Sequence, residues 1–123
     1  MAYKQVLVDL EINGSVKIKS SLLSYQENTD IDSAATEDVA SFSSTDYDAG
    51  FFDYVIKSGT NIRVGTVIAA HDGTDVEFTE KTTNDLGDTS GVTLSVIKSG
   101  SDIKLQATTN TDNWEIKTLV RTL

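Results

Sequence analysis

The 123-residue sequence contains no cysteine and no proline, and its single histidine is His71. Without cysteine there is no disulfide framework, no thiolate zinc site and no thiol nucleophile. No apolar run approaches the roughly 20 residues of a membrane helix, and the longest, such as Val67 to Ala70, have the length of a strand. The N-terminus also lacks the basic lead and long apolar block of a secretory signal. The sequence therefore predicts a single domain with one core, no membrane span and no export signal.

Basic residues are missing from one long stretch of the chain. The formal net charge is −9, and between Lys19 and Lys57 the sequence has eight acidic residues and no basic one. Nucleic-acid phosphates bind clustered Lys and Arg, so this distribution argues against a nucleic-acid partner. The stretch is predicted to be a solvated loop. A cation site and a docking face for a basic partner are the functional alternatives.

Thr and Ser make up 29 of the 123 residues, and apolar residues fall mostly at every second position, which is typical of β-strands. A hairpin is predicted over residues 1–19, with Asn13-Gly14 as its turn. Residues 20–50 lose the alternation and are predicted to form a long acidic crossing loop. The alternation returns over residues 51–123, which are predicted to supply the strands of the sandwich. The predicted fold class is all-β, a jelly-roll-like antiparallel β-sandwich of about eight short strands in one domain spanning residues 1–123.

A ten-residue pattern occurs twice. Val55 to Val64 reads VIKSGTNIRV, and Val96 to Leu105 reads VIKSGSDIKL, with six identical positions. Each copy has the form strand, Ser-Gly turn, strand, and glycine allows the positive φ that such a turn needs. Two corresponding hairpins of a sandwich explain the repeat, which has too few copies for a solenoid. The glycines predicted to occupy structural turns are Gly14, Gly59, Gly73 and Gly100.

The sequence offers no catalytic constellation. A serine triad would need His71, which lies beside the Asp72-Gly73 turn, and the chain has no Gly-x-Ser-x-Gly motif. Nineteen acidic residues make some carboxylate pair inevitable, so the acids alone do not indicate a glycosidase. We therefore predict no catalytic residue and no cofactor, and expect a protein that is not an enzyme.

Asn28, Asp30 and Asp32 have the alternate-position oxygens of a calcium-binding loop. Ser33 and Val39 stand where an EF-hand has glycine and a bidentate glutamate. The three residues are therefore candidates only for a looser calcium site, and solvated carboxylates are the alternative interpretation.

Four aromatic residues, Tyr47, Phe51, Phe52 and Tyr54, are close together in the sequence. Flat rings could line a platform for a sugar, which would make the chain a glycan-binding module. Aromatic residues at strand positions more often belong to a core, and that interpretation is favoured here.

The run from Tyr54 to Val96, which includes YVIKSGTNIRVGTVIAAHDGTDVEFTE and TNDLGDTSGVTLSV, resembles a module of tail-fibre and other structural proteins of tailed bacteriophages. The stretch from Ile103 to Arg121, IKLQATTNTDNWEIKTLVR, is similar too. The resemblance implies a jelly-roll module that forms a homotrimer in the virion, at a fibre tip or as a capsid decoration or cement protein. It implies other virion proteins as partners, such as capsid or tail proteins, and assembly in the host cytoplasm. The alternative function is recognition of a host surface glycan.

Fibre proteins carry an anchor and a shaft before such a module, whereas Met1 lies only a hairpin and a loop away here. We therefore expect attachment through the surface of this domain. The N-terminal hairpin, Tyr3 to Ile18, offers an alternating strand that could extend a partner's sheet edge, whereas the acidic segment between Ser20 and Ile56 would attach by charge. The strand is favoured, and its attachment candidates are Val6, Val8, Leu10 and Ile12.

A homotrimer would also explain a second apolar face on the strands of the sandwich. Left uncovered, such a face would expose a large apolar patch to water. The residues expected to form it are Phe51, Val55, Val67 and Ala69.

Overall fold

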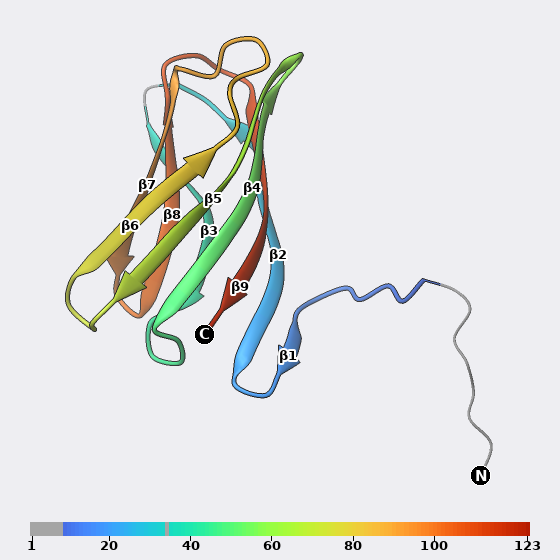
Figure 1. The fold of residues 1–123 in the computed structure, drawn as a ribbon. Helices are drawn as coiled ribbons and strands as arrows, with labels where there is room; N and C mark the ends of the chain where they lie inside the picture. The colour runs from blue at the N-terminus through green and yellow to red at the C-terminus, as the bar shows by residue number, and fades with distance from the viewer. Residues whose placement is uncertain (1–8, 34) are drawn as a thin grey trace.

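The computed structural model describes residues 9–33 and 35–123, which fold into two antiparallel sheets packed face to face (Figure 1). The larger sheet has six strands in the order β1-β2-β9-β4-β5-β6, and the smaller has three in the order β3-β8-β7. The prediction of an all-β antiparallel sandwich is confirmed. The strands are β1 (Val16–Ile18), β2 (Ser21–Ile31), β3 (Thr36–Ser43), β4 (Ala49–Ser58), β5 (Asn61–His71), β6 (Val76–Thr82), β7 (Val92–Ser99), β8 (Asp102–Thr109) and β9 (Trp114–Thr122).

The core lies between the sheets because alternate residues of the central strands are apolar. On β4, Phe52, Tyr54 and Ile56 point inward and are at most 2% exposed. They belong to one cluster with Ile103 and Leu105 of β8, which are fully buried in the smaller sheet. The alternation that is visible in the sequences of β4 and β8 is therefore the alternation that builds the core.

The outer strands pair in a nested manner, β2 with β9 in the larger sheet and β3 with β8 in the smaller. The inner strands depart from this pattern, because β4-β5-β6 is a meander within the larger sheet and β7-β8 is a hairpin within the smaller. The connectivity is therefore that of an antiparallel sandwich in which only the outer strands are nested.

The prediction of an acidic crossing loop over residues 20–50 is wrong, because this stretch contains β2, β3 and the start of β4. The apolar alternation is missing because inward positions of β2 carry polar side chains that bond the main chain of β3. Gln26 Nε2 donates to Ser41 O, and Ser41 N donates to Gln26 Oε1, both at 2.8 Å. Asn28 Nδ2 donates to the main-chain oxygen of Asp38 at 3.0 Å. The acidic residues lie mostly at exposed positions of these strands and of the turns.

The prediction of an N-terminal hairpin over residues 1–19, with its turn at Asn13-Gly14, is also wrong. β1 pairs with β2, and the reversal falls at Lys19-Ser20, where Lys19 has a φ of 54° and Ser21 Oγ donates to Ile18 O at 2.8 Å. Asn13-Gly14 is a bend before β1, in which Gly14 has a φ of 154°. Residues 9–12, the described part of the strand predicted before that bend, are not in a strand, and the rest of that predicted strand lies outside the described residues.

Gly59 and Gly100 both have a φ of 60° in the two-residue turns that close the β4-β5 and β7-β8 hairpins. A side chain is strained at this φ, which explains the glycines. Gly73 has a φ of 94° in the turn between β5 and β6. There, Asp72 Oδ1 accepts main-chain N–H bonds from Thr74 at 2.9 Å and Asp75 at 2.7 Å.

The two repeat copies form the two hairpins, one in each sheet, and they bury opposite faces. In the smaller sheet the cross-strand pair Val96 and Leu105 points into the core, at 6% and 0% exposure. The equivalent pair in the larger sheet, Val55 and Val64, points outward, at 39% and 42% exposure. A strand that turns over moves its whole apolar set to the other face. The larger sheet therefore has apolar residues on both faces.

Candidate functional site on the outer face of the larger sheet

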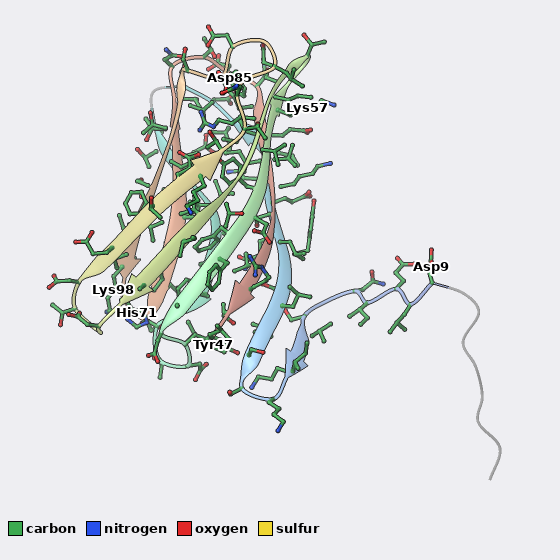
Figure 2. The ribbon with its side chains drawn as sticks, viewed as in Figure 1. Asp9, Tyr47, Lys57, His71, Asp85 and Lys98 are labelled. Carbon is green, nitrogen blue, oxygen red and sulfur yellow. The ribbon has the colours of Figure 1, made fainter. Side chains whose placement is uncertain are left out.

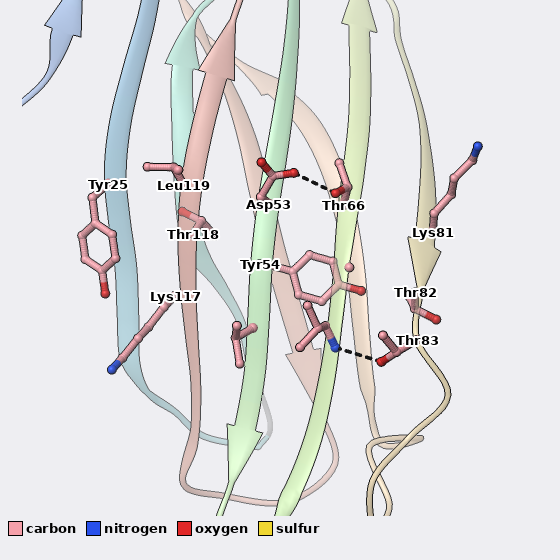
Figure 3. Close-up of a pocket in the computed structure, with 13 residues that line it drawn as sticks. Tyr25, Asp53, Tyr54, Thr66, Lys81, Thr82, Thr83, Lys117, Thr118 and Leu119 are labelled. Atoms are coloured by element: carbon pink, nitrogen blue, oxygen red, sulfur yellow. Dashed lines mark hydrogen bonds between the residues drawn. The ribbon is translucent and has the colours of Figure 1, made fainter.

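A shallow groove of about 620 Å³ lies on the face of the larger sheet that turns away from the core (Figure 3). Val55 of β4, Val64 of β5 and Leu119 of β9 form its apolar floor. Tyr25 of β2 stands beside Leu119 as a cross-strand neighbour, with 55% of its surface exposed. We call Tyr25, Val55, Val64 and Leu119 the apolar strip.

A hydrogen-bonded polar group adjoins the apolar strip. Arg121 Nε donates to Asp53 Oδ2 at 3.0 Å, and Thr66 Oγ1 donates to Asp53 Oδ1 at 2.7 Å. The Arg121 guanidinium also lies 4.8 Å from the centre of the Phe51 ring, a cation–π contact worth about 0.5–1 kcal/mol at an exposed site. The face thus combines apolar contact area with polar atoms in fixed positions.

Two lysines lie on opposite sides of the groove, Lys117 of β9 and Lys81 of β6 (Figure 3). Neither has an ion-pair partner among the described residues. Both ammonium groups are therefore available to a ligand or partner that enters the groove.

The ring of Tyr25 is held in place by its own strand. Its hydroxyl donates to Glu27 Oε2 at 2.7 Å. This hydrogen bond raises the pKa of Tyr25 above its usual value, with burial and the Glu27 charge adding to it. The phenol is thus neutral at physiological pH, and its ring presents a fixed apolar face.

Beneath the groove, a buried polar network ties the larger sheet to the start of β7. The Tyr54 hydroxyl donates to Glu80 Oε2, and the guanidinium of Arg63 lies 3.4 Å from the same carboxylate. Arg63 also donates to the main-chain oxygens of Thr89, at 3.2 Å, and Val92, at 3.1 Å. Burial, followed by the hydrogen bond to Glu80, raises the pKa of Tyr54 well above its usual range. Its hydroxyl, its carboxylate and two guanidinium nitrogens are engaged with one another or with the main chain, so the network is structural. Arg63 Nε is buried and has no hydrogen-bond partner among the described residues.

The calcium candidates Asn28, Asp30 and Asp32 do not converge. Asn28 Oδ1 accepts the Asp30 N–H at 3.1 Å, and the Asn28 amide reaches β3. Asp32 Oδ1 accepts the N–H of Asn113 at 3.1 Å, in the turn before β9. The structure also has no group of three or more His, Asp or Glu residues arranged for a metal ion among the residues it describes.

The aromatic cluster is mostly core, as favoured from the sequence: Tyr47, Phe52 and Tyr54 are at most 6% exposed. Phe51 lies on the outer face beneath Arg121. His71 is structural as well. Gly73 N donates to its Nδ1 at 3.0 Å, so that Nε2 donates to the Tyr47 carbonyl at 2.6 Å.

The expected second apolar face exists but has different members. Val67 and Ala69 were expected there, and both are core residues, at most 1% exposed, because they alternate with the outward positions of β5. Phe51 and Val55 do point outward. Of the attachment candidates, Leu10 and Ile12 are 81% and 50% exposed in the segment before β1, and Val6 and Val8 lie outside the described residues.

Sequence reasoning missed Tyr25 and Leu119. Tyr25 falls in the stretch that was interpreted as a loop, and Leu119 looks like an ordinary strand residue between Thr118 and Val120. The signal that could have revealed this face is the repeat. Neighbouring residues of a strand point to opposite faces, so Val55, and with it its partner Val64, must face outward if Ile56 faces the core.

The chain is a small antiparallel β-sandwich, and the outer face of its larger sheet is partly apolar. A crystal structure of the tailspike protein of the Acinetobacter phage vB_ApiP_P1 contains a similar fold, with a TM-score of 0.53 and 18% sequence identity. The match covers 99% of this chain and 26% of the tailspike, so the chain spans about a quarter of that protein's length. No protein-family model matches the sequence, and no curated protein does. Within the described residues, no helix is long and apolar enough to cross a membrane.

Proposed function

We propose that the chain is a non-enzymatic structural module of a tailed-phage virion, carried on the tail, that associates with copies of itself through the outer face of its larger sheet. The observation that carries this proposal is the apolar strip. Its four residues are 39% to 55% exposed in the single chain, and a contiguous apolar patch rimmed by polar groups is typical of a protein interface.

The repeat supports this interpretation of the strip. In the smaller sheet the paired residues Val96 and Leu105 of the repeat are buried in the core, whereas in the larger sheet the equivalent pair, Val55 and Val64, points outward. Covering them with a second chain would remove them from water, at roughly 25 cal/mol per Å² of apolar surface. The tailspike-like fold favours the tail over the capsid, and a homotrimer is the proposed assembly.

Native mass spectrometry of the purified chain tests the assembly. We expect three chains in the wild type and monomers in Val64→Lys, because a lysine in the strip would be buried in the interface. Thr93→Lys is the matched control, since Thr93 is an exposed outward residue of β7 on the other sheet. A wild-type monomer at micromolar concentration, or a Val64→Lys trimer, would contradict the proposed interface.

Immunogold labelling of phage particles that carry an epitope-tagged chain tests the location. Gold at the tail supports the proposal. Gold over the head would replace it with a capsid decoration or cement role, and unlabelled particles would refute a virion role altogether.

Glycan binding is a second candidate because of Tyr25, Lys81 and Lys117. A fixed ring beside two lysines without ion pairs suits a saccharide that carries acidic groups. A glycan array tests this, with Tyr25→Ala expected to abolish binding. Phe78→Ala is the control, because Phe78 is an aromatic residue of similar exposure, 42%, outside the groove. An array without any bound glycan would remove this candidate.

A further inference from the structure

One edge of the larger sheet is only partly covered. β9 pairs with β2 from Leu22 to Asn28 and, after a bulge at Thr29 and Asp30, again at Ile31, but β1 pairs only with Ser21, Leu22 and Leu23 on the other side. No strand among the described residues pairs with that side of β2 from Ser24 to Asp30. Figure 1 shows the described residues before β1 leading away from the sheet, and Figure 2 places Asp9 far from β2. Closer to β1, residues 12–15 line a pocket together with Ser24, Tyr25 and Gln26. We call Ser24 to Asp30 the open edge.

The protein closes a comparable edge elsewhere. β3 is an edge strand of the smaller sheet, and its main-chain groups at Ser41 and Asp38 are bonded by Gln26 and Asn28. Within the open edge, the Asp30 N–H is accepted by Asn28 Oδ1 at 3.1 Å, and from Ser24 to Thr29 no side chain among the described residues bonds the main chain on the side away from β9. Unpaired N–H and C=O groups in a row form a template for another strand.

The chain's own N-terminal segment does not fit this edge. Extending the β1 register would place Asp9 opposite Asp30 and Ile12 opposite Glu27, with Glu11 beside the same carboxylates. Like charges directly opposite in a sheet are destabilising. The same repulsion acts against this segment of a second copy, and against two β2 edges pairing with each other.

We infer that the open edge binds an extended, lysine- or arginine-bearing segment of another protein, which adds a strand to the larger sheet. Main-chain hydrogen bonds would supply affinity, and the exposed carboxylates Glu27 and Asp30 would select basic side chains opposite them. Tyr25, on the outer side of β2, would take an apolar residue as its cross-strand neighbour. The inference rests on the proposed role as a structural module of the virion, for which it names the chemistry of a partner other than a second copy.

The probe is the capped peptide Lys-Thr-Thr-Lys-Thr-Val-Thr, which in antiparallel register places its lysines opposite Asp30 and Glu27 and its valine opposite Tyr25. Fluorescence anisotropy of a labelled peptide measures binding, and amide hydrogen exchange locates it. We expect saturable binding that weakens at least tenfold when the lysines become glutamates. Amides of residues 24–30 that exchange quickly in the free protein should become protected.

Backbone methylation separates strand addition from simple charge attraction. An added strand uses alternate N–H groups, so of two peptides N-methylated at odd or at even positions, only one should lose binding at least tenfold. Equal binding of both methylated peptides, or absence of binding by the lysine peptide, would overturn the inference.

Glu27→Lys should reverse the preference towards the glutamate peptide. The control is Glu77→Lys, the same change on β6 at the opposite edge of the sheet, which should leave the preference unaltered. The peptide measurements use only purified protein, so they are independent of the particle-labelling experiment. Absence of peptide binding would not change the labelling result, and unlabelled particles would not change the peptide-binding result.

Discussion

Gly65 lies in the middle of β5, and alanine at this position is expected to destabilise the protein. Its φ is not among the positive values of the chain, so alanine would ordinarily strengthen the strand by about 0.5–1 kcal/mol. Here a Cβ would lie 2.6 Å from the Tyr54 hydroxyl and would also overlap the Lys81 carbonyl oxygen. The ring of Tyr54 reaches Glu80 only because residue 65 has no side chain.

The magnitude follows from these two contacts. Overpacking of a tight site costs about 1–3 kcal/mol, and the carbonyl of Lys81 cannot move freely because Thr66 pairs with Lys81 in the β5-β6 ladder. We therefore expect Gly65→Ala to lower the free energy of unfolding by about 2 kcal/mol. Tyr54→Phe alone should cost about 1–2 kcal/mol, since Glu80 loses a hydrogen bond at a partly buried site.

A double-mutant cycle tests the reasoning by urea denaturation, with the fluorescence of Trp114 as signal because this only tryptophan is buried. The double variant should be more stable than the sum of the single effects by about 1 kcal/mol, because phenylalanine removes the oxygen that the Cβ would strike. Additive effects, or a Gly65→Ala variant as stable as the wild type, would refute the role assigned to Gly65.

Two further predictions concern titration and turns. Burial raises the pKa of Tyr54 in the folded protein, so the unfolded chain loses this proton at a lower pH, and the free energy of unfolding should fall as pH rises above about 10. Urea midpoints between pH 8 and 11 should fall less steeply in Tyr54→Phe than in the wild type. Equal slopes in the two proteins would contradict the assignment. Val in place of Gly59 or Gly100, each with a φ of 60°, should lower stability by about 1 kcal/mol or more, and unchanged thermal midpoints in both variants would show that these turns tolerate a side chain.

The sequence predicted the strands after residue 51 because their inward residues are apolar and their turns carry glycine. β4 and the β7-β8 hairpin follow this rule along their length, and β5 follows it at Val67 and Ala69. β2 and β3 could not be predicted in the same way. Gln26 and Asn28 face inward and satisfy main-chain groups of β3, a role that a polar residue in a sequence does not reveal without the neighbouring strand.

The outer face shows a second limit of sequence patterns. Val55 to Val64 and Val96 to Leu105 share six identical positions, yet one copy buries Ile56 and the other buries Val96. A period of two specifies that residues alternate, and the opposing sheet decides which set is buried. The apolar strip could therefore be located only once both sheets were placed.

Gln26 offers a test of how the edge of β3 is closed. Its amide donates to Ser41 O and accepts from Ser41 N, both at 2.8 Å, so Gln26→Leu leaves two partly buried main-chain groups without partners. The expected cost is about 1–3 kcal/mol in the free energy of unfolding.

Gln26→Glu distinguishes the donor from the acceptor. At pH 7 the carboxylate can still accept from Ser41 N but faces the Ser41 carbonyl oxygen without a proton to donate, which raises the pKa of the new glutamate in the folded state. A raised folded-state pKa adds stability at low pH that is lost as pH rises, so this variant should be closest to the wild type near pH 4 and fall behind it towards pH 7. Urea denaturation of both proteins at the two pH values measures the difference. A stability gap that does not depend on pH would mean that the side-chain amide of Gln26 does not serve the β3 edge as a donor.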